Sequence, residues 1–186
     1  MQMLHTLLHK QRQRVGFHAI VTAIGGSMRR VDRQQSEAFG KRILDEAPYG
    51  ILSLVDHDGT PYAIPISFVR SGQTIYLHGA SEGKKLDIIA EHDQVAFTCV
   101  GKTQVLPESF TTNYESVVTN GSARIVDDPE EKRKGLLLLA KKYSSSYMEK
   151  AKKYVESSLD ETSVVAITIT TISAKARIPK QEEHHD

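Results

Sequence analysis

The chain has little of several features that would narrow its class. Its 186 residues include one cysteine, Cys99, and no tryptophan, and the formal net charge is +1. A single cysteine excludes an internal disulfide framework and a metal site built from several cysteines, and it favours a reducing, cytoplasmic location. A net charge near zero gives no general attraction for nucleic acid or for an anionic membrane. A charged ligand must therefore be held by a local cluster of side chains.

Long apolar runs are missing too. No stretch approaches the roughly 18 to 20 apolar residues that a membrane-spanning helix needs, so we expect no membrane partner. Residues 1–27 hold a mildly apolar stretch behind three basic residues; it loosely resembles a signal peptide but lacks an Ala-x-Ala cleavage site. We interpret residues 1–27 as a disordered or misassigned extension, residues 28–178 as the globular domain, and residues 179–186 as a polar tail.

β-Branched and aromatic residues gather in short runs between turn signals. Residues 49–55 and 61–69 flank the turn sequence Asp56-His57-Asp58-Gly59, and two such runs around an Asp-Gly turn predict a β-hairpin. Residues 101–113 are rich in Gly, Pro, Ser, Thr and Asn and are predicted to form a loop. The other predicted strands are 74–78, 95–100, 114–126 and 163–172.

Helices are predicted between some of these strands. Phe39, Ile43 and Leu44 recur at helical spacing, and Asp128 followed by Pro129 is a typical helix start. The predicted helices cover about 35–46, 86–92, 129–142 and 147–157. Six strands with short helices between them predict a mainly β fold with peripheral helices. We expect a closed or partly closed antiparallel barrel, because closure removes exposed strand edges.

One run, residues 78–87, has the composition of an anion site. Gly79 and Gly83 let the backbone approach a ligand and adopt positive φ, and the free amides of a helix start favour an anion. Lys84 and Lys85 add positive charge that suits a phosphate group. A solvated turn followed by a basic helix start explains the same residues equally well, so both interpretations stay open at this point.

Several separate stretches occur in a characteristic order: 28–30, 62–67, 76–80, 83–87, 110–118, 121–124, 128–133 and 141–144. Their order and spacing resemble the FMN-binding split-barrel superfamily that includes pyridoxamine 5'-phosphate oxidase, and look closest to its nitroimidazole-resistance (Nim) branch. The resemblance covers about residues 28–178. No single stretch carries it alone.

The resemblance implies a six-stranded antiparallel split β-barrel that forms a homodimer, with two FMN sites at the subunit interface. Residues 64–67 would lie along the isoalloxazine ring, Lys84 and Lys85 would bind the phosphate, and Ser116 would come from the partner subunit. The cofactor-binding residues that it implies are Ile64, Pro65, Ile66, Ser67, His78, Gly79, Ala80, Gly83, Lys84, Lys85 and Ser116.

Three further residues have open or structural interpretations. His78 could transfer a proton beside a flavin or only shape the loop, since flavin itself supplies the redox chemistry. Tyr114 could face a substrate pocket or the dimer interface. Cys99 lies in the middle of an apolar strand, which predicts a buried structural thiol. No metal is expected.

The C-terminal arginine/histidine segment of pyridoxamine phosphate oxidases is not evident, so we do not expect a true oxidase of that kind. The leading hypothesis is an FMN-dependent oxidoreductase that reduces small aromatic or nitro compounds. Because the sequence has no Rossmann fingerprint, NAD(P)H would visit the flavin only transiently. The alternatives are a non-catalytic module that stores flavin or holds haem, and a barrel used only for dimerisation.

Overall fold

The computed structural model describes residues 28–178, so the interpretations of residues 1–27 and 179–186 lie outside the described residues. Contacts within the chain separate Met1–Asp32 from Arg33–Asp186, and the described strands and α-helices belong to the second unit. None of the helices in the described part is both long and apolar enough to cross a membrane.

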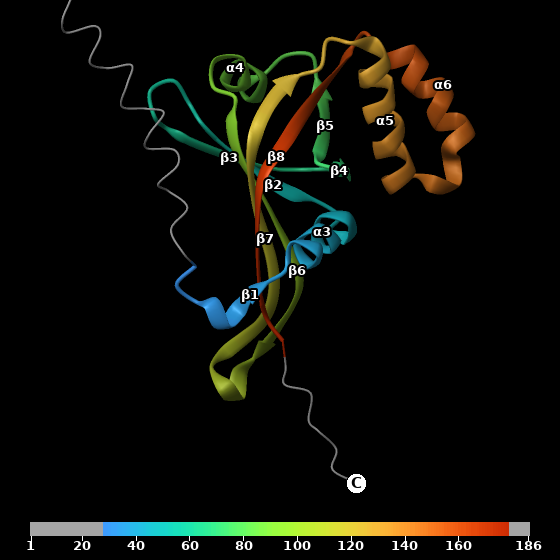
Figure 1. The fold of residues 1–186 in the computed structure, drawn as a ribbon. Helices are drawn as coiled ribbons and strands as arrows, with labels where there is room; N and C mark the ends of the chain where they lie inside the picture. Colours follow the sequence, from blue (N-terminus) through green and yellow to red (C-terminus); the bar gives the residue numbers. More distant parts are fainter. Residues whose placement is uncertain (1–27, 179–186) are drawn as a thin grey trace, which may run out of the picture. The chain divides into compact units, whose positions relative to one another are not determined.

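The strands are β1 (Gln34–Gln35), β2 (Gly50–Val55), β3 (Pro61–Ile66), β4 (Phe68–Ser71), β5 (Thr74–Ala80), β6 (Gln94–Leu106), β7 (Thr111–Ile125) and β8 (Thr162–Arg177). The α-helices are α3 (Glu37–Glu46), α4 (Lys84–Glu91), α5 (Pro129–Tyr143) and α6 (Met148–Ser158). Short 3-10 turns are η1 (Val31–Arg33), η2 (Pro107–Ser109) and η3 (Ser145–Tyr147). Figure 1 shows their arrangement.

The strands form one antiparallel sheet in the order β3-β2-β6-β7-β8-β5-β4, with the short β1 paired to β8. Its two outermost strands, β3 and β4, follow each other in the chain with only Ser67 between them. The sheet must therefore curl round until its edges meet at this residue, although β3 and β4 do not pair. This is a split barrel, and it confirms the predicted fold class.

The prediction was wrong in two details of the strands. The run predicted as one strand over 61–69 is divided at Ser67, and the short β1 was not predicted, so the sheet has eight strands rather than six. The loop predicted at 101–113 is mostly strand, because β6 continues through a bulge between Val100 and Thr103 and pairs again with β7 as far as Leu106. Backbone pairing with β7 outweighs the local turn signals. Within the predicted loop, the 3-10 turn Pro107–Ser109 interrupts the strands, as the proline suggests.

The predicted helix start at Asp128 and Pro129 is confirmed, and α3 begins with a cap that was not predicted. The Ser36 hydroxyl accepts a hydrogen bond from the Phe39 amide at 3.2 Å and caps α3. The Asp128 carboxylate accepts one from the Glu131 amide at 3.0 Å and caps α5, whose first residue is a proline. Such caps satisfy amides that have no partner within the helix.

Buried side chains form two clusters, one on each side of β5. The barrel core includes Phe68 and Phe97, whose ring centroids lie 4.7 Å apart edge to face, together with Leu77. The second cluster lies under α5 and α6 and includes Tyr76 and Val155. Because neighbouring residues of a strand point to opposite faces, β5 contributes to both clusters.

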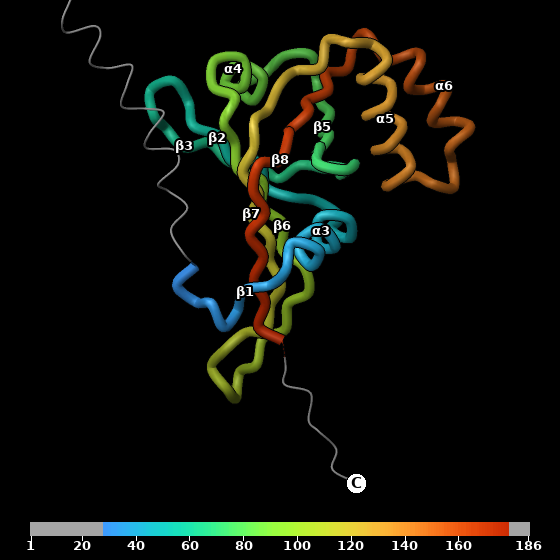
Figure 2. The backbone as a smooth tube through the Cα atoms, in the orientation of Figure 1, coloured from blue at the N-terminus to red at the C-terminus, as the bar shows by residue number. Residues whose placement is uncertain are grey.

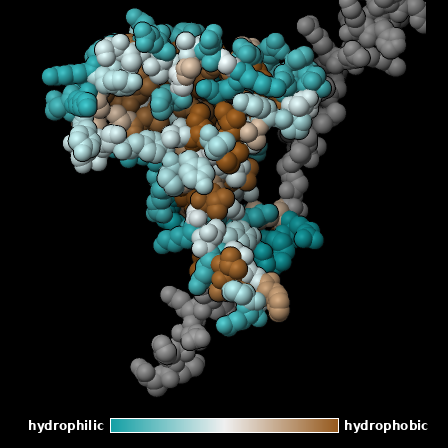
Figure 3. Space-filling model, turned by 180° about the vertical axis from the view of Figure 1, so that it is seen from behind, coloured by the Kyte–Doolittle hydropathy of each residue, from teal (hydrophilic) through white to brown (hydrophobic). Residues whose placement is uncertain are grey.

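Strands β6, β7 and β8 continue beyond the barrel as an extension of the sheet, where they lie side by side in both views (Figures 1 and 2). Figure 3 shows hydrophobic surface on this extension as well as on the barrel. The exposed apolar side chains of β6, β7 and their connecting turn are Val100, Val105, Phe110 and Val118.

Candidate functional site

The turn between β5 and α4 leaves the start of the helix open. Gly83 has φ +134° and occupies the cap position, where no side chain bonds to the helix amides. The Leu86 and Asp87 amides bond to the Gly83 carbonyl. The amides of Lys84 and Lys85, the first two helical residues, precede the first helical hydrogen bond and are available to a ligand.

Lys85 lies at the edge of the barrel core without a carboxylate partner among residues 28–178. Its side chain is half-buried, and this burial lowers the pKa of its ammonium group. A Cβ atom added to Gly79 would lie 2.5 Å from the Lys85 Nζ. The absence of a side chain at Gly79 therefore provides the space that the ammonium group occupies.

Lys84 has a different environment. Its Nζ lies 2.9 Å from the Asp56 carboxylate and 5.3 Å from the centroid of the Tyr62 ring. Asp56 also accepts a hydrogen bond from the His57 amide at 2.8 Å. Lys84 first, and His57 second, hold the pKa of Asp56 well below its usual range. Lys84 thus ties α4 to the β2–β3 turn, and sequence reasoning missed this role of Asp56.

The four predicted residues at the end of β3 and just after it are divided between two faces. Ile64 and Ile66 are partly buried and pack against the barrel core, whereas Pro65 and Ser67 are exposed. β3 pairs only with β2, so one edge of its backbone is free. A flat ligand along this strand would meet that free edge rather than four side chains on one surface.

His78 and Ser67 belong to a separate pocket. It has a volume of about 680 Å³ and lies between β5 and helices α5 and α6. His78 precedes Gly79 in β5 and so points to the opposite face of the strand. The surrounding protein, and second the charge of Lys85, lower the pKa of its imidazole. Ala80 is exposed at the end of the strand.

Ser116 lies far along the sheet from the β5–α4 turn. It pairs with Lys175 of β8, whereas His78 pairs with Val164 of the same strand. These partners are eleven residues apart, which at roughly 3.3 Å per residue corresponds to up to about 36 Å. Within one protomer the fold therefore does not bring Ser116 to the turn.

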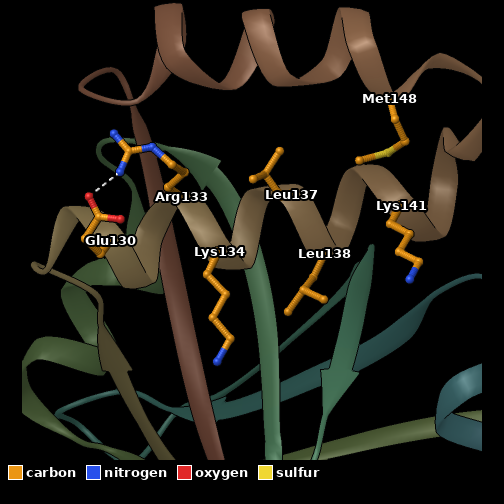
Figure 4. A pocket seen from close by; sticks show the side chains of 7 residues that line it. All are labelled: Glu130, Arg133, Lys134, Leu137, Leu138, Lys141 and Met148. Carbon is orange, nitrogen blue, oxygen red and sulfur yellow. Dashed lines mark hydrogen bonds and ion pairs between the residues drawn. The ribbon is translucent and has the colours of Figure 1, made fainter.

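A smaller pocket of about 420 Å³ lies along α5 beside the start of α6 (Figure 4). Its lining residues are Glu130, Arg133, Lys134, Leu137, Leu138, Lys141 and Met148. Arg133 is engaged with Glu130 and Glu156, each at 2.6 Å. The pocket contains none of the predicted site residues.

Two further candidates, Cys99 and Tyr114, lie away from the β5–α4 turn in β6 and β7. Cys99 is 1% exposed, and burial raises the pKa of its thiol to about 12, which confirms the predicted buried thiol. The Arg33 guanidinium lies 5.9 Å from the centroid of the Tyr114 ring. Over residues 28–178, no three His, Cys, Asp or Glu side chains are grouped in a way that could hold a metal ion.

Several solved structures share this fold. They include a protein from Bacteroides thetaiotaomicron named for 5-nitroimidazole antibiotic resistance, with 22% identity, a TM-score of 0.63, and coverage of 76% of this chain and 84% of that chain. The flavocytochrome Anf3 from Azotobacter vinelandii has 24% identity, a TM-score of 0.69, and coverage of 81% and 72%. The FAD and haem binding protein from Mycobacterium smegmatis has 24% identity, a TM-score of 0.68, and coverage of 77% and 73%. At these identities the likeness shows the fold alone.

Sequence comparison identifies the family. No curated protein matches the chain. The profile of the family described as pyridoxamine 5'-phosphate oxidase matches residues 37–176, which include every strand of the split barrel except β1 and the end of β8, as well as the β5–α4 turn. The chain therefore belongs to the pyridoxamine 5'-phosphate oxidase family.

Proposed function

We propose that the β5–α4 turn binds the phosphate of a flavin, FMN, and that the protein is an oxidoreductase acting on small aromatic or nitro compounds. One observation carries the phosphate site. Lys85 is a half-buried cation without a carboxylate partner in the described chain, and it lies beside Gly79 at the uncapped start of α4.

The residues of the turn fit a phosphate. Its oxygens would accept hydrogen bonds from the first amides of α4 and from the Lys85 ammonium, and both interactions favour an anion. Because burial disfavours the charged form of Lys85, a phosphate would also stabilise that charge. Lys84 contributes by holding α4 against Asp56.

The free edge of β3 is the proposed position for the flavin ring. Backbone groups of residues 64–66 along this edge are not paired to another strand and would bind the polar edge of the ring. Ser67 directly follows β3 and lines the pocket that also contains His78, so one end of the ring would reach that pocket. Bound flavin would supply the redox chemistry, and the role of the chain is to orient the ring and limit access of water.

We further propose a homodimer. Ser116 is too far along the sheet to reach the turn of its own protomer. The extension that carries Ser116 also exposes apolar side chains, among them Val100 at 58% and Val118 at 40%. Burying such a surface against a second copy would be favourable, and it would bring a Ser116 to each flavin.

The names of related structures support the proposal. Two of them are named for flavin, one as a flavocytochrome and one as an FAD and haem binding protein, and a third is named for 5-nitroimidazole resistance. They also define the alternative, which is a module that stores flavin or holds haem. His78, an imidazole of lowered pKa on a pocket wall, is the residue that favours haem as a ligand.

The decisive measurement is titration of the purified protein with FMN, FAD and haemin, followed by absorption spectroscopy. We expect stoichiometric binding of FMN, tighter than that of FAD. The bound flavin should bleach with NADH or NADPH under anaerobic conditions and recover when a nitroimidazole is added. A protein that binds neither flavin contradicts the proposal. Bound flavin that no donor reduces supports the storage module instead.

A further inference from the structure

The pocket between β5, α5 and α6 has the features of a ligand site in its own right. Its volume of about 680 Å³ lies within the range of small-molecule sites, roughly 300 to 1,000 Å³. Its floor is apolar and includes Leu136, Leu139 and Val155, which are 8%, 4% and 5% exposed. This space is built within one protomer.

One wall of the pocket is fixed in place by hydrogen bonds. The Tyr143 hydroxyl accepts a bond from the Phe68 amide at 2.9 Å and lies 2.8 Å from the Pro48 carbonyl, a suitable acceptor for its proton. This network joins the end of α5 to the junction of β3 and β4. The Tyr143 side chain, which lines the pocket, is thereby held before any ligand arrives.

Aromatic side chains are exposed at the pocket rather than buried in a core. Tyr147 and Tyr154 line it and are 69% and 71% exposed. Exposed apolar surface around a hollow is typical of a binding site, and tyrosine rings stack favourably on a flat aromatic ligand.

The charge of the lining has one sign. None of the lining residues is a carboxylate, whereas one, Lys150, is a lysine. Lys150 has no ion-pair partner among residues 28–178. Its neighbours on α6, Glu149 and Lys152, instead form an ion pair with each other at 2.7 Å. An anionic group at this pocket would meet a free ammonium group and no opposing negative charge.

We propose that this pocket binds a small, flat aromatic carboxylate, with its ring between Tyr147 and Tyr154 and its carboxylate at Lys150. The site is on the opposite face of β5 from the proposed phosphate site. That the ligand is also the compound reduced by the flavin rests on the proposed function, but the binding itself does not.

The test uses the full-length protein without added flavin and two probes of nearly equal size. These are 2-naphthoate and its uncharged analogue 2-naphthamide, titrated by isothermal calorimetry. We expect naphthoate to bind about five- to tenfold more tightly than naphthamide, as a partly exposed charge-assisted contact allows. Lys150→Met should remove this difference. The matched control Lys153→Met, which changes an exposed lysine of α6 that does not line the pocket, should keep it.

A second variant tests whether the probes bind inside the pocket or only to the surface charge of α6. Ala151→Phe places a ring in the pocket and should weaken both probes at least about tenfold, with thermal unfolding as the check that the fold persists. The proposal is overturned if wild-type protein binds no naphthoate, if both probes bind equally, or if Lys150→Met or Ala151→Phe leaves naphthoate binding unchanged. Repeating the titration on flavin-loaded protein tests the redox role separately. Naphthoate should then perturb the flavin absorption, and binding without such a change retains the site but removes its role in reduction.

Discussion

The two faces of β5 hold different chemistry within the length of one strand. On the barrel side, Ile75 and Leu77 are fully buried, and Gly79 leaves space for the Lys85 ammonium. On the helix side, Tyr76 packs under α5, and His78 lines an aromatic pocket. Residues that are neighbours in the chain thus serve separate sites, because side chains alternate between the faces of a strand.

The difference also shows how one turn separates two lysines that look equivalent in the sequence. Lys84 is exposed and paired with Asp56, whereas Lys85 turns toward the strand and has no carboxylate partner in the described chain. Only the second is available to an anion without giving up an existing ion pair.

Shortening a barrel-side residue of β5 should have the largest effect. Leu77 is 0% exposed, and we expect Leu77→Ala to lower the free energy of unfolding by about 2–5 kcal/mol through lost burial and a cavity. On the helix side, Tyr76→Phe removes only a hydrogen bond to Glu131 of 3.2 Å and should cost about 0.5–1.5 kcal/mol. Urea unfolding measures both, and equal losses would contradict the contrast between the faces.

Removing the Lys85 charge should have the next largest effect, on FMN affinity. Lys85→Met removes a charge-assisted contact of about 1.5–3 kcal/mol, or roughly 10- to 100-fold in the dissociation constant. Lys84→Met should weaken binding by no more than about fivefold, since its charge is engaged by Asp56 at the surface. Quenching of FMN fluorescence gives both constants. Equal losses in the two variants would show that the phosphate does not distinguish the lysines.

Adding one methyl group to β5 should displace the Lys85 side chain. The Cβ of Gly79→Ala would lie 2.5 Å from the Lys85 Nζ, and the flexible side chain can move away at little cost in stability. We expect FMN affinity to fall about three- to tenfold while the free energy of unfolding changes by less than about 1 kcal/mol. Ala90→Ser, at an exposed position of α4 outside the proposed site, is the control and should leave FMN affinity unchanged.

The smallest effect concerns two histidines with opposite pKa shifts. The pKa of His78 is lowered by its surroundings, so below about pH 6.5 the unfolded chain binds the proton first. The stability of the fold therefore decreases as the pH decreases. The pKa of His57 is raised by Asp56, so its contribution is present below about pH 6.5 and is lost as pH rises through the folded pKa.

Two matched variants separate these contributions. His78→Gln should flatten the acid side of the stability curve, and His57→Gln should flatten the alkaline side. Urea unfolding between about pH 5 and 8 measures the slopes, and NMR titration of the ring protons identifies which histidine is responsible. A His78 titration midpoint above that of the unfolded chain would contradict the lowered pKa.

Local signals in the sequence predicted much of the barrel. Ser36 and Asp128 cap the predicted helices, and the Asp-Gly turn at Gly59 joins the predicted hairpin with φ +85°. Residues 101–113 were predicted incorrectly because their composition is typical of loops, while their pairing is with a strand partner that local rules do not see. The β3–β4 division at Ser67 was missed because the two strands pair with different partners, β2 and β5, which local rules do not see either.

The sequence by itself determined the helices, the hairpin, the buried thiol of Cys99 and the position of a glycine- and lysine-bearing turn. These follow from capping, turn chemistry and periodicity, which act over a few residues. Only the tertiary structure decided that Lys85 remains without a carboxylate partner in the described chain, and that His78 faces a pocket with α5 and α6. Both depend on how the sheet curls and which helices cover each face, and those contacts join residues far apart in the chain.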